Sequence, residues 1–280
     1  MENTIRCLTE AAKRLGLNYR YVDKNQNFII IDEQLYFQLN RTPFNSESMA
    51  RMCKDKEHQY ECLTPLVNIP KAIGFLDHTI PEAYQQYVRY HSHDAILDAI
   101  EQQFGYPVVL KPNRGALGNN VFCCKSRQQA LTALNTIFDK QSPSYDYVAI
   151  AQQYIKPKQE YRVICFDGEP VLCYERVFGQ ADFGAKYWQN EQGAVIALDV
   201  NGIARRAADE FAPALKLPGL RYVGLDVIVD EQDTLHLIEI NSGPQVNHFI
   251  EKNGETLIID MYENILKRYY ASLENDRAAV

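Results

Sequence analysis

The sequence lacks any long apolar run. No stretch of its 280 residues approaches the roughly 20 apolar residues that a membrane-spanning helix needs. Residues 1–7 also lack the basic start and the apolar centre of a secretion signal. Both absences argue against a helical membrane protein and against a secreted precursor, so we expect a cytoplasmic protein.

Runs of basic residues are also missing. The chain has 29 Lys and Arg against 36 Asp and Glu, a formal net charge of -7, and no Lys/Arg run longer than a pair. Proteins that bind nucleic acid usually carry a basic stripe for the phosphate backbone. We therefore expect neither nucleic acid nor a membrane as a partner. A hydrophobic content of 46% is enough for a substantial core in one or two domains.

The seven cysteines lack the CxxC spacing of a redox or zinc motif. Their number is odd, and several lie in apolar segments with a strand-like pattern. Cys123 and Cys124 are adjacent, so in a strand they would point to opposite sides. We expect buried, reduced thiols here rather than disulfides or a metal site.

The hydrophobic pattern predicts a mixture of helices and strands, an α+β fold in which the strands need not all be parallel. Helical spacing is expected over residues 4–15, 49–63, 92–104, 127–139, 203–215 and 255–270. Strands are expected over residues 19–22, 27–31, 34–39, 69–75, 107–110, 121–124, 147–153, 161–166, 170–176, 222–229 and 235–241. The polar, aromatic-rich residues 178–193 are expected to form a mobile loop that acts as a substrate lid.

Three oxygen-bearing side chains interrupt the last predicted hairpin. Glu239 and Asn241 alternate with apolar residues and therefore share one face of their strand. A four-residue loop at 231–234 would place Asp226 opposite Glu239. Two carboxylates and an amide are hard oxygen ligands that suit Mg²⁺. Taken alone, the same pattern also fits a hairpin with one solvated face.

A second feature is Lys111 at the end of a predicted strand, followed by Gly115 and Gly118. Glycines allow backbone N–H groups to approach phosphate oxygens closely, and the lysine adds a positive charge. The order of residues does not match the Walker sequence, in which the lysine follows the glycines. By itself the segment also fits an ordinary turn.

Between these two features lies a connector, Gln152-Gln153-Tyr154-Ile155, that leads to Glu160-Tyr-Arg162. An extended connector can offer backbone groups to an adenine ring, and Glu160 can accept a hydrogen bond from a ribose hydroxyl. Arg162 and Arg176 fall on successive strands, where both could face phosphate charge. As single residues, each also fits an ordinary surface position.

These segments together resemble the ATP-grasp superfamily. In chain order they are Asp55-Lys56-Glu57, Lys111 with its glycine loop, the connector, Glu160-x-Arg162, Asn190-x-x-Gly193-Ala194, Gly224-x-Asp226 and Glu239-x-Asn241-Ser-Gly-Pro. Within the superfamily, the chain is similar to the carboxylate-amine ligases. It resembles in particular the glutamate-ligase type that modifies ribosomal protein S6 and the ATP-grasp part of cyanophycin synthetase. The resemblance covers about residues 45 to 270.

The resemblance implies a specific architecture, with ATP held between two lobes of mostly antiparallel sheets. It divides the chain into a short N-terminal α/β element (1–45), a first lobe (46–151) and a second lobe with the metal site (152–280). Family members commonly carry a larger N-terminal domain that helps to bind the substrate. The short element here implies a substrate site that is reduced, open or completed by a second subunit. The third alternative makes a homodimer an expectation.

The resemblance also implies roles for individual residues. The implied nucleotide ligands are Lys56, Lys111, Gly115, Gly118, Gln152, Gln153, Tyr154, Ile155, Glu160 and Asn190. Asp226, Glu239 and Asn241 would hold two Mg²⁺ ions, with Mn²⁺ as a substitute. Lys111, Arg162 and Arg176 would act in catalysis. Two departures from the family pattern are Glu175 beside Arg176 and residues 184–190, which carry no recognisable specificity signature.

The implied reaction is phosphorylation of a carboxylate by ATP, followed by attack of an amine on the acyl phosphate to give an amide, ADP and phosphate. The carboxylate and the amine would belong to a small molecule, such as an amino acid, or to a peptide. Two alternatives remain open at this point: a small-molecule kinase on the same fold, and a non-catalytic nucleotide-binding module.

Overall fold

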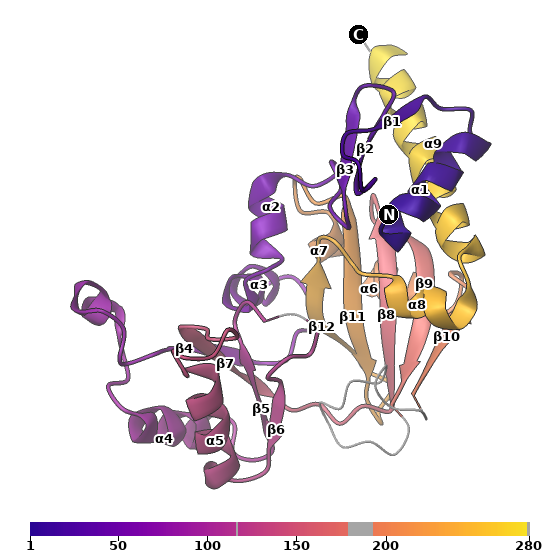
Figure 1. The fold of residues 1–280 in the computed structure, drawn as a ribbon. Coiled ribbons are helices and arrows are strands. Elements are labelled where there is room, and N and C mark those ends of the chain that lie inside the picture. The colour runs from indigo at the N-terminus through magenta and orange to yellow at the C-terminus, as the bar shows by residue number, and fades with distance from the viewer. Residues whose placement is uncertain (116, 179–192, 279–280) are drawn as a thin grey trace.

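The computed structural model describes residues 1–115, 117–178 and 193–278 of the chain. Within these residues, the strands form three sheets whose strand pairs are all antiparallel. One lobe lies at the lower left of Figure 1, and the larger sheet, the N-terminal element and the C-terminal helix form the rest. None of the helices in these residues is long and apolar enough to cross a bilayer.

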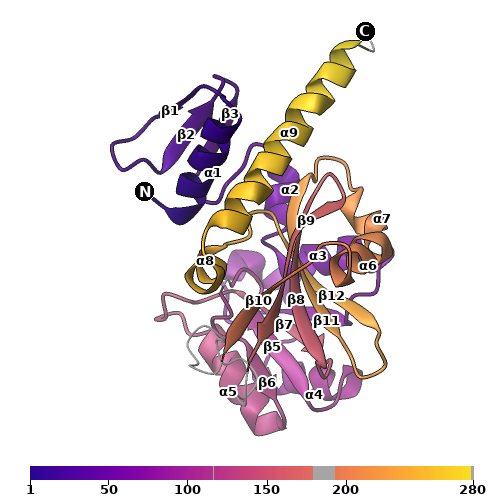
Figure 2. The ribbon, with the colours of Figure 1, turned by 90° about the vertical axis from the view of Figure 1, so that its right-hand side faces the viewer.

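The N-terminal element is one helix packed beside a small three-stranded sheet (Figure 2). Ile5, Leu8 and Ala12 form the buried stripe of the helix, and Gly16 follows its end with a φ of +66°. Glycine adopts this left-handed conformation without a steric penalty, which explains the stop. The elements are α1 (Asn3–Arg14), β1 (Tyr19–Tyr21), β2 (Phe28–Ile31) and β3 (Leu35–Gln38).

The first lobe is a four-stranded sheet in the order β4-β7-β5-β6 with two helices packed against it. Ser92 and Ser126 begin these helices, because each hydroxyl accepts a hydrogen bond from a first-turn N–H. The elements are β4 (Ala72–Leu76), the 3-10 helix η1 (Glu82–Tyr87), α4 (His93–Gln103), β5 (Val108–Pro112), β6 (Phe122–Cys124), α5 (Arg127–Ile137) and β7 (Val148–Gln153).

The second lobe is a five-stranded sheet in the order β10-β9-β8-β11-β12. One face packs on two short helices through Val163, Val223 and Leu225, among others (Figure 2). The strands are β8 (Gln159–Phe166), β9 (Glu169–Val177), β10 (Ala194–Leu198), β11 (Tyr222–Val229) and β12 (Leu235–Asn241). The helices on this face are α6 (Ile203–Glu210) and α7 (Ala212–Leu215).

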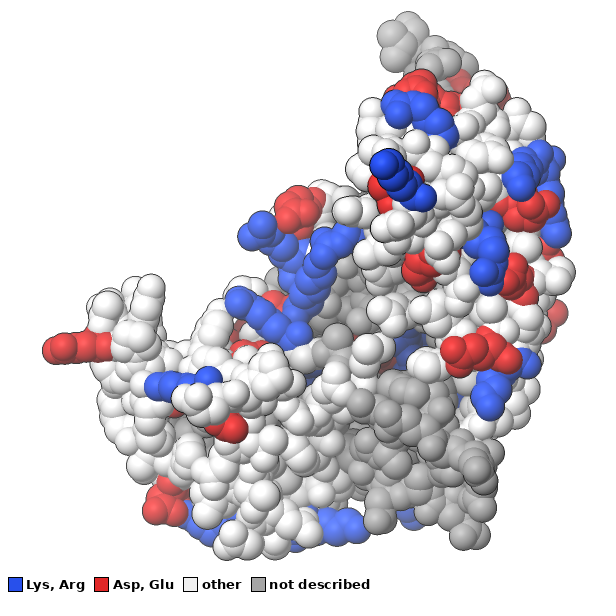
Figure 3. Space-filling view, in the orientation of Figure 1, with Lys and Arg blue, Asp and Glu red and all other residues white. Residues whose placement is uncertain are grey.

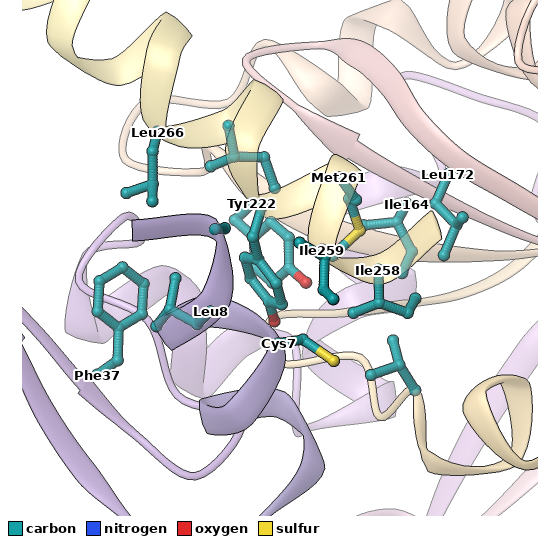
Figure 4. Close-up of a cluster of buried hydrophobic side chains, with 14 of the residues drawn as sticks. Cys7, Leu8, Phe37, Ile164, Leu172, Tyr222, Ile258, Ile259, Met261 and Leu266 are labelled. Atoms are coloured by element: carbon teal, nitrogen blue, oxygen red, sulfur yellow. The ribbon is translucent and has the colours of Figure 1, made fainter. Parts of the chain in front are cut away.

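The opposite face of this sheet is apolar at one end of the strands and carries charged side chains at the other. At one end, Ile164 and Tyr222 lie in a core with residues of α1 and of the C-terminal helices α8 (Asn247–Asn253) and α9 (Thr256–Ala278). Figure 4 shows Tyr222 surrounded by side chains of α1 and α9, such as Leu8 and Ile259. Further along β11 the same face carries Asp226. The N-terminal element thus covers the apolar end of the face, and the polar end is left for the site.

Two segments predicted as single continuous helices each form two shorter helices. The helix expected over residues 49–63 is broken into α2 (Glu47–Met52) and α3 (Lys56–Leu63), because the Asp55 carboxylate accepts from His58 N–H and starts a new helix. The helix expected over residues 203–215 is divided into α6 and α7. Pro213 has no N–H to continue the hydrogen-bond ladder there.

Several elements were not expected from the sequence. The strand β10 and the helices η1 and α8 had no predicted counterpart, and α9 extends well beyond residue 270. The loop expected at residues 178–193 lies, except for its two ends, outside the described residues. The boundaries proposed for the N-terminal element and the two lobes stay predictions.

Candidate active site

Three neighbouring strands carry a row of charged side chains across the second-lobe sheet. Asp226 on β11 pairs with Glu239 on β12 and, on its other side, with Arg162 on β8. The predicted pairing of Asp226 with Glu239 is therefore confirmed. Gly224, two residues before Asp226, leaves room for the row, because a Cβ there would lie 2.8 Å from Pro244 Cβ and 3.2 Å from Arg162 Cδ.

The loop length and the strand register that produce this pairing differ from the predicted ones. Val229 pairs with Leu235, so the loop begins at Asp230 and is one residue longer than the predicted loop at 231–234. A register shift between Asp226 and Val227 then leaves Ile238 as an extra residue on β12. This bulge moves Glu239 off the face that Leu235 and Leu237 bury, and re-aims it toward the site.

Asp226 is buried and surrounded by positive charge. Arg162 donates from Nε to Oδ1 at 2.6 Å and from a terminal nitrogen to Oδ2 at 2.9 Å. Arg176 lies 2.9 Å from Oδ1. Burial by itself would raise the pKa of Asp226, but the two guanidinium groups outweigh it and lower the pKa below its usual value. The carboxylate is therefore ionised at neutral pH.

Asn241 joins the two carboxylates. Its Nδ2 lies 3.2 Å from Asp226 Oδ2 and 3.2 Å from Glu239 Oε1. An asparagine side chain also carries an acceptor oxygen, so the three side chains together offer oxygens to a cation. Among the described residues, no three or more His, Cys, Asp or Glu gather into a metal cluster. A set of two carboxylates and one amide fits Mg²⁺, which keeps water or phosphate oxygens as its other ligands.

Glu160 on β8 has an arginine partner in this structure. Arg176 donates to Glu160 Oε1 at 2.9 Å. Burial raises the pKa of Glu160, and its pair with Arg176 opposes that shift only in part. Both predicted arginines therefore face carboxylates here, and their predicted contacts with phosphate stay predictions.

In the first lobe, Lys111 on β5 is buried, with 5% of its surface exposed. Its Nζ donates to Gln152 Oε1 on β7 at 2.8 Å. Burial lowers the pKa of Lys111 to about 8, with Glu239 opposing the shift and Lys56 adding to it. The predicted adenine-side residue Gln152 and the predicted phosphate ligand Lys111 are thus in direct contact.

Lys56 begins α3 and lies where the two lobes meet. Its Nζ donates to the backbone oxygen of Gly115 at 2.8 Å and lies 3.7 Å from Glu239 Oε2. Gly115 follows the strand of Lys111, whereas Glu239 belongs to the hairpin of β11 and β12, which we call the acidic hairpin. One lysine therefore contacts both features that the sequence singled out.

The other predicted nucleotide ligands lie around this point. Gly118 has a φ of +67°, a conformation that favours glycine. Gln153 ends β7, and Tyr154 and Ile155 are half-buried in the connector between β7 and β8. Asn190 lies outside the described residues.

Sequence reasoning missed two buried amides beside the site. Asn113, two residues after Lys111, accepts from Glu57 N–H through its side chain at 3.0 Å. Gln59 accepts from Ile240 N–H at 2.8 Å. Asn and Gln are common on surfaces, and no motif marks these two. Their only sequence signal is proximity to Lys111 and Lys56.

A hollow separates the two lobes in the space-filling view, and Lys and Arg side chains gather on its upper edge beside α2 (Figure 3). Arg51 and Lys54 of this segment are exposed. The hydrogen bond from Arg51, with Lys54 and Arg41 nearby, lowers the pKa of Glu47. Lys and Arg side chains thus gather at this edge, although the chain as a whole is acidic.

Similarity to known proteins identifies the family of this chain. Residues 76–267 match the family model of the RimK-like ATP-grasp domain. The match covers more than half of the 280 residues, and the chain belongs to this family. The expected α+β ATP-grasp fold is confirmed.

The relatives are ligases by name. A probable alpha-L-glutamate ligase of Pasteurella multocida is 26% identical over 167 residues, which are 59% of this chain and 50% of that protein. A glutathione synthetase of Brucella melitensis is 28% identical over 164 residues, covering 58% of this chain and 51% of that protein. The chain spans about half the length of these curated relatives.

Solved structures share the fold at low identity. The ATP-grasp ligase PsnB, in a complex with a phosphomimetic variant of its minimal precursor, Mg and ADP, has a TM-score of 0.55 and 14% identity. The similarity covers 80% of this chain and 61% of that one. At this identity the likeness bears on the fold alone.

Proposed function

We propose that this protein is an ATP- and Mg²⁺-dependent ligase that joins a carboxylate to an amine through an acyl phosphate. The substrates would be small molecules, such as amino acids, or peptides. The names of the relatives, glutamate ligase and glutathione synthetase, support this class of reaction. A cytoplasmic location and a homodimer, both expected from the sequence, belong to the same proposal.

The observation that carries the proposal is the position of Lys56. It contacts the loop after Lys111 and lies beside Glu239, which supports a proposed phosphate-binding segment on one side of Lys56 and the proposed metal ligands on the other. An ATP whose phosphates lay between them would meet lysines on one side and a carboxylate-bound cation on the other. This is the charge arrangement that phosphoryl transfer requires.

The proposed roles follow the positions of the residues. Lys56, Lys111, Gly115 and Gly118 would bind phosphates, the connector from Gln152 to Ile155 would hold adenine, and Glu160 would bind ribose. Asn190 would complete the nucleotide site. Asp226, Glu239 and Asn241 would hold two Mg²⁺ ions, or Mn²⁺ in their place. When bound, the metal supplies charge neutralisation at the phosphates.

The reaction would proceed in two balanced steps. A substrate carboxylate oxygen forms a bond to the γ-phosphorus as the bond to the β,γ-bridging oxygen breaks, and ADP leaves. The amine nitrogen then bonds to the acyl carbon, phosphate leaves with the C–O electron pair, and the nitrogen loses a proton. Arg162 and Arg176 would supply positive charge to the phosphoryl oxygens. Closure of the lobes would exclude water from the acyl phosphate.

Hydroxylamine trapping tests the proposal. With ATP, Mg²⁺, hydroxylamine and a pool of amino acids and short peptides, we expect ADP and a hydroxamate, because hydroxylamine attacks acyl phosphates. Glu239→Gln should reduce both products by at least about a hundredfold, since one metal-ligand charge is lost. ADP and hydroxamate are read by coupled absorbance and by mass spectrometry.

Glu231→Gln is the matched control, because Glu231 lies in the loop of the same hairpin and pairs with exposed Lys156. It should keep wild-type turnover. A stable phosphorylated product without hydroxamate would replace the ligase by a kinase. Full activity of Glu239→Gln would remove the metal assignment, and failure of the wild-type protein to bind nucleotide would contradict the proposal as a whole.

A further inference from the structure

Gln59 is a buried residue of α3 that contacts the edge strand β12. Only 3% of its surface is exposed. Its Nε2 donates to the backbone oxygen of Cys53 at 2.8 Å, and its Oε1 accepts from the N–H of Ile240 at 2.8 Å. Both ends of the amide are therefore used, one within its own segment and one on β12.

The β12 contact falls between two proposed metal ligands. Ile240 separates Glu239 from Asn241, so holding its N–H fixes the backbone from which both side chains project. The ladder to β11 is irregular just before this point, where Ile238 is the extra residue of the bulge. Because β12 is an edge strand of its sheet, its outer N–H groups need partners from elsewhere. Gln59 supplies one of them.

The first turn of α3 is hydrogen-bonded to Asn113, which directly follows β5 of the first lobe. The backbone N–H of Lys56 donates to Asn113 O at 3.3 Å, and that of Glu57 donates to Asn113 Oδ1 at 3.0 Å. Asn113 is 2% exposed and lies two residues after Lys111. The helix α3 is therefore hydrogen-bonded to the loop after Lys111 through its first turn and to the metal-ligand strand through Gln59.

We propose that Gln59 is a positioning residue that holds Glu239 and Asn241 in the arrangement that takes a divalent cation, and that ties them through α3 to the Lys111 loop. The inference rests on the proposed function, because it assumes that Asp226, Glu239 and Asn241 hold the cation. Residues that orient metal ligands commonly change metal affinity by 10- to 100-fold when they are replaced.

Gln59→Met tests the role, because methionine has a similar length and no hydrogen-bonding amide. Mn²⁺ binding in the presence of ADP is titrated by electron paramagnetic resonance, a readout that needs no turnover. We expect the Mn²⁺ dissociation constant to rise by about tenfold or more. ADP affinity in the absence of metal should change by less than about twofold, since Gln59 contacts no proposed nucleotide ligand except through α3.

Asn68→Ala is the matched control. Asn68 also holds β12, donating to Leu235 O at 2.7 Å, but it does so at the start of the strand and away from the ligands. Its loss should lower the thermal midpoint and leave Mn²⁺ affinity within about twofold of wild type. Equal weakening of Mn²⁺ binding in both variants would overturn the proposal, and so would wild-type affinity in Gln59→Met.

Hydrogen exchange of the wild-type protein provides a second measurement that does not depend on a variant folding. Addition of Mn²⁺ and ADP should slow exchange in residues 56–63 together with residues 238–242. Protection of the second segment without the first would overturn the role of Gln59. A wild-type protein that binds ADP without binding Mn²⁺ would instead contradict the proposed metal site, so the two failures are distinguishable.

Discussion

The two lobes hold their buried cations in different ways. In the second lobe, Arg162 faces Asp226 with two hydrogen bonds, and Arg176 contacts both Asp226 and Glu160. In the first lobe, the hydrogen-bond partner of Lys111 is the neutral amide of Gln152. The second lobe thus neutralises its own charges, whereas the first lobe buries a cation that an anionic ligand would stabilise.

This difference has a consequence for ligand binding. A buried charge without a close counter-ion costs free energy, which is why burial lowers the pKa of Lys111 to about 8. A phosphate beside Lys111 would remove that cost. Asp226 already has two cationic neighbours, so a metal ion has to compete with them. We therefore expect the nucleotide to bind mainly through the first lobe. We expect metal binding to require the carboxylates of the second lobe together with a nucleotide held by the first.

The largest expected effect comes from breaking the paired charges of the second lobe. Asp226→Asn leaves Arg162 and Arg176 without their shared carboxylate, and we expect the free energy of unfolding to fall by about 3 to 5 kcal/mol. Urea denaturation measures the change.

A double variant, Asp226→Leu with Arg162→Met, removes both members of the closest pair and should recover part of that loss, because the unpaired charge is gone. If the single variant is as stable as wild type, the arginines do not depend on Asp226, and the comparison between the lobes fails.

An intermediate effect of opposite sign is expected in the first lobe. Lys111→Met removes a buried cation and should raise the stability of the ligand-free protein at pH 7 by about 1 to 2 kcal/mol. The folded pKa of about 8 lies below the ordinary value of 10.5, so the unfolded state binds more protons between these values. Wild-type stability should therefore rise relative to the variant from pH 8 to 10.5, and the full deficit should be present below pH 8.

Urea denaturation at several pH values measures this difference. The control is Lys125→Met, at an exposed lysine of the same lobe, which should stay within about 0.5 kcal/mol of wild type. A Lys111→Met protein that is less stable than wild type at pH 7 would show that Lys111 is already neutralised without a ligand.

The smallest expected effect is at the exposed end of the acidic hairpin. Lys156→Ala removes the ion pair with Glu231, in which both side chains are more than half exposed. Solvent screens such pairs, so we expect no measurable change in Tm. A clear fall in Tm would mean that this exposed ion pair stabilises the fold as the buried Arg162–Asp226 pair does. Burial would then not explain the difference between strong and weak ion pairs in this protein.

Much of the fold could be predicted, because local signals dominate it. Hydrophobic periodicity predicted α1, α4 and α5 close to their observed bounds, and strand-like patterns predicted β8 and β9 within two residues of theirs. The continuous helix expected at residues 49–63 was wrong because an Asp55 cap outweighs helical spacing. The sequence does not predict β10, because this strand directly follows the polar residues 178–193, for which the sequence predicts a loop.

Part of the site could also be predicted. Alternation placed Glu239 and Asn241 together, and the hairpin paired Asp226 with Glu239. The correct pairing came from a loop that was one residue too short and from a bulge that was not foreseen, and these two differences cancel. The roles assigned to the nucleotide and metal residues stay predictions for the experiments above.

By itself, the sequence determined which residues alternate and where α1, α4 and α5 lie, because these depend on neighbours within a few positions. It also carries the ordered motifs that relate the chain to the ATP-grasp family. Only the tertiary structure decided that Arg162 and Arg176 share Asp226, that Lys56 meets both lobes and that Gln59 holds Ile240. These contacts join residues far apart in the chain, and they form because buried polar groups must find partners wherever packing brings them.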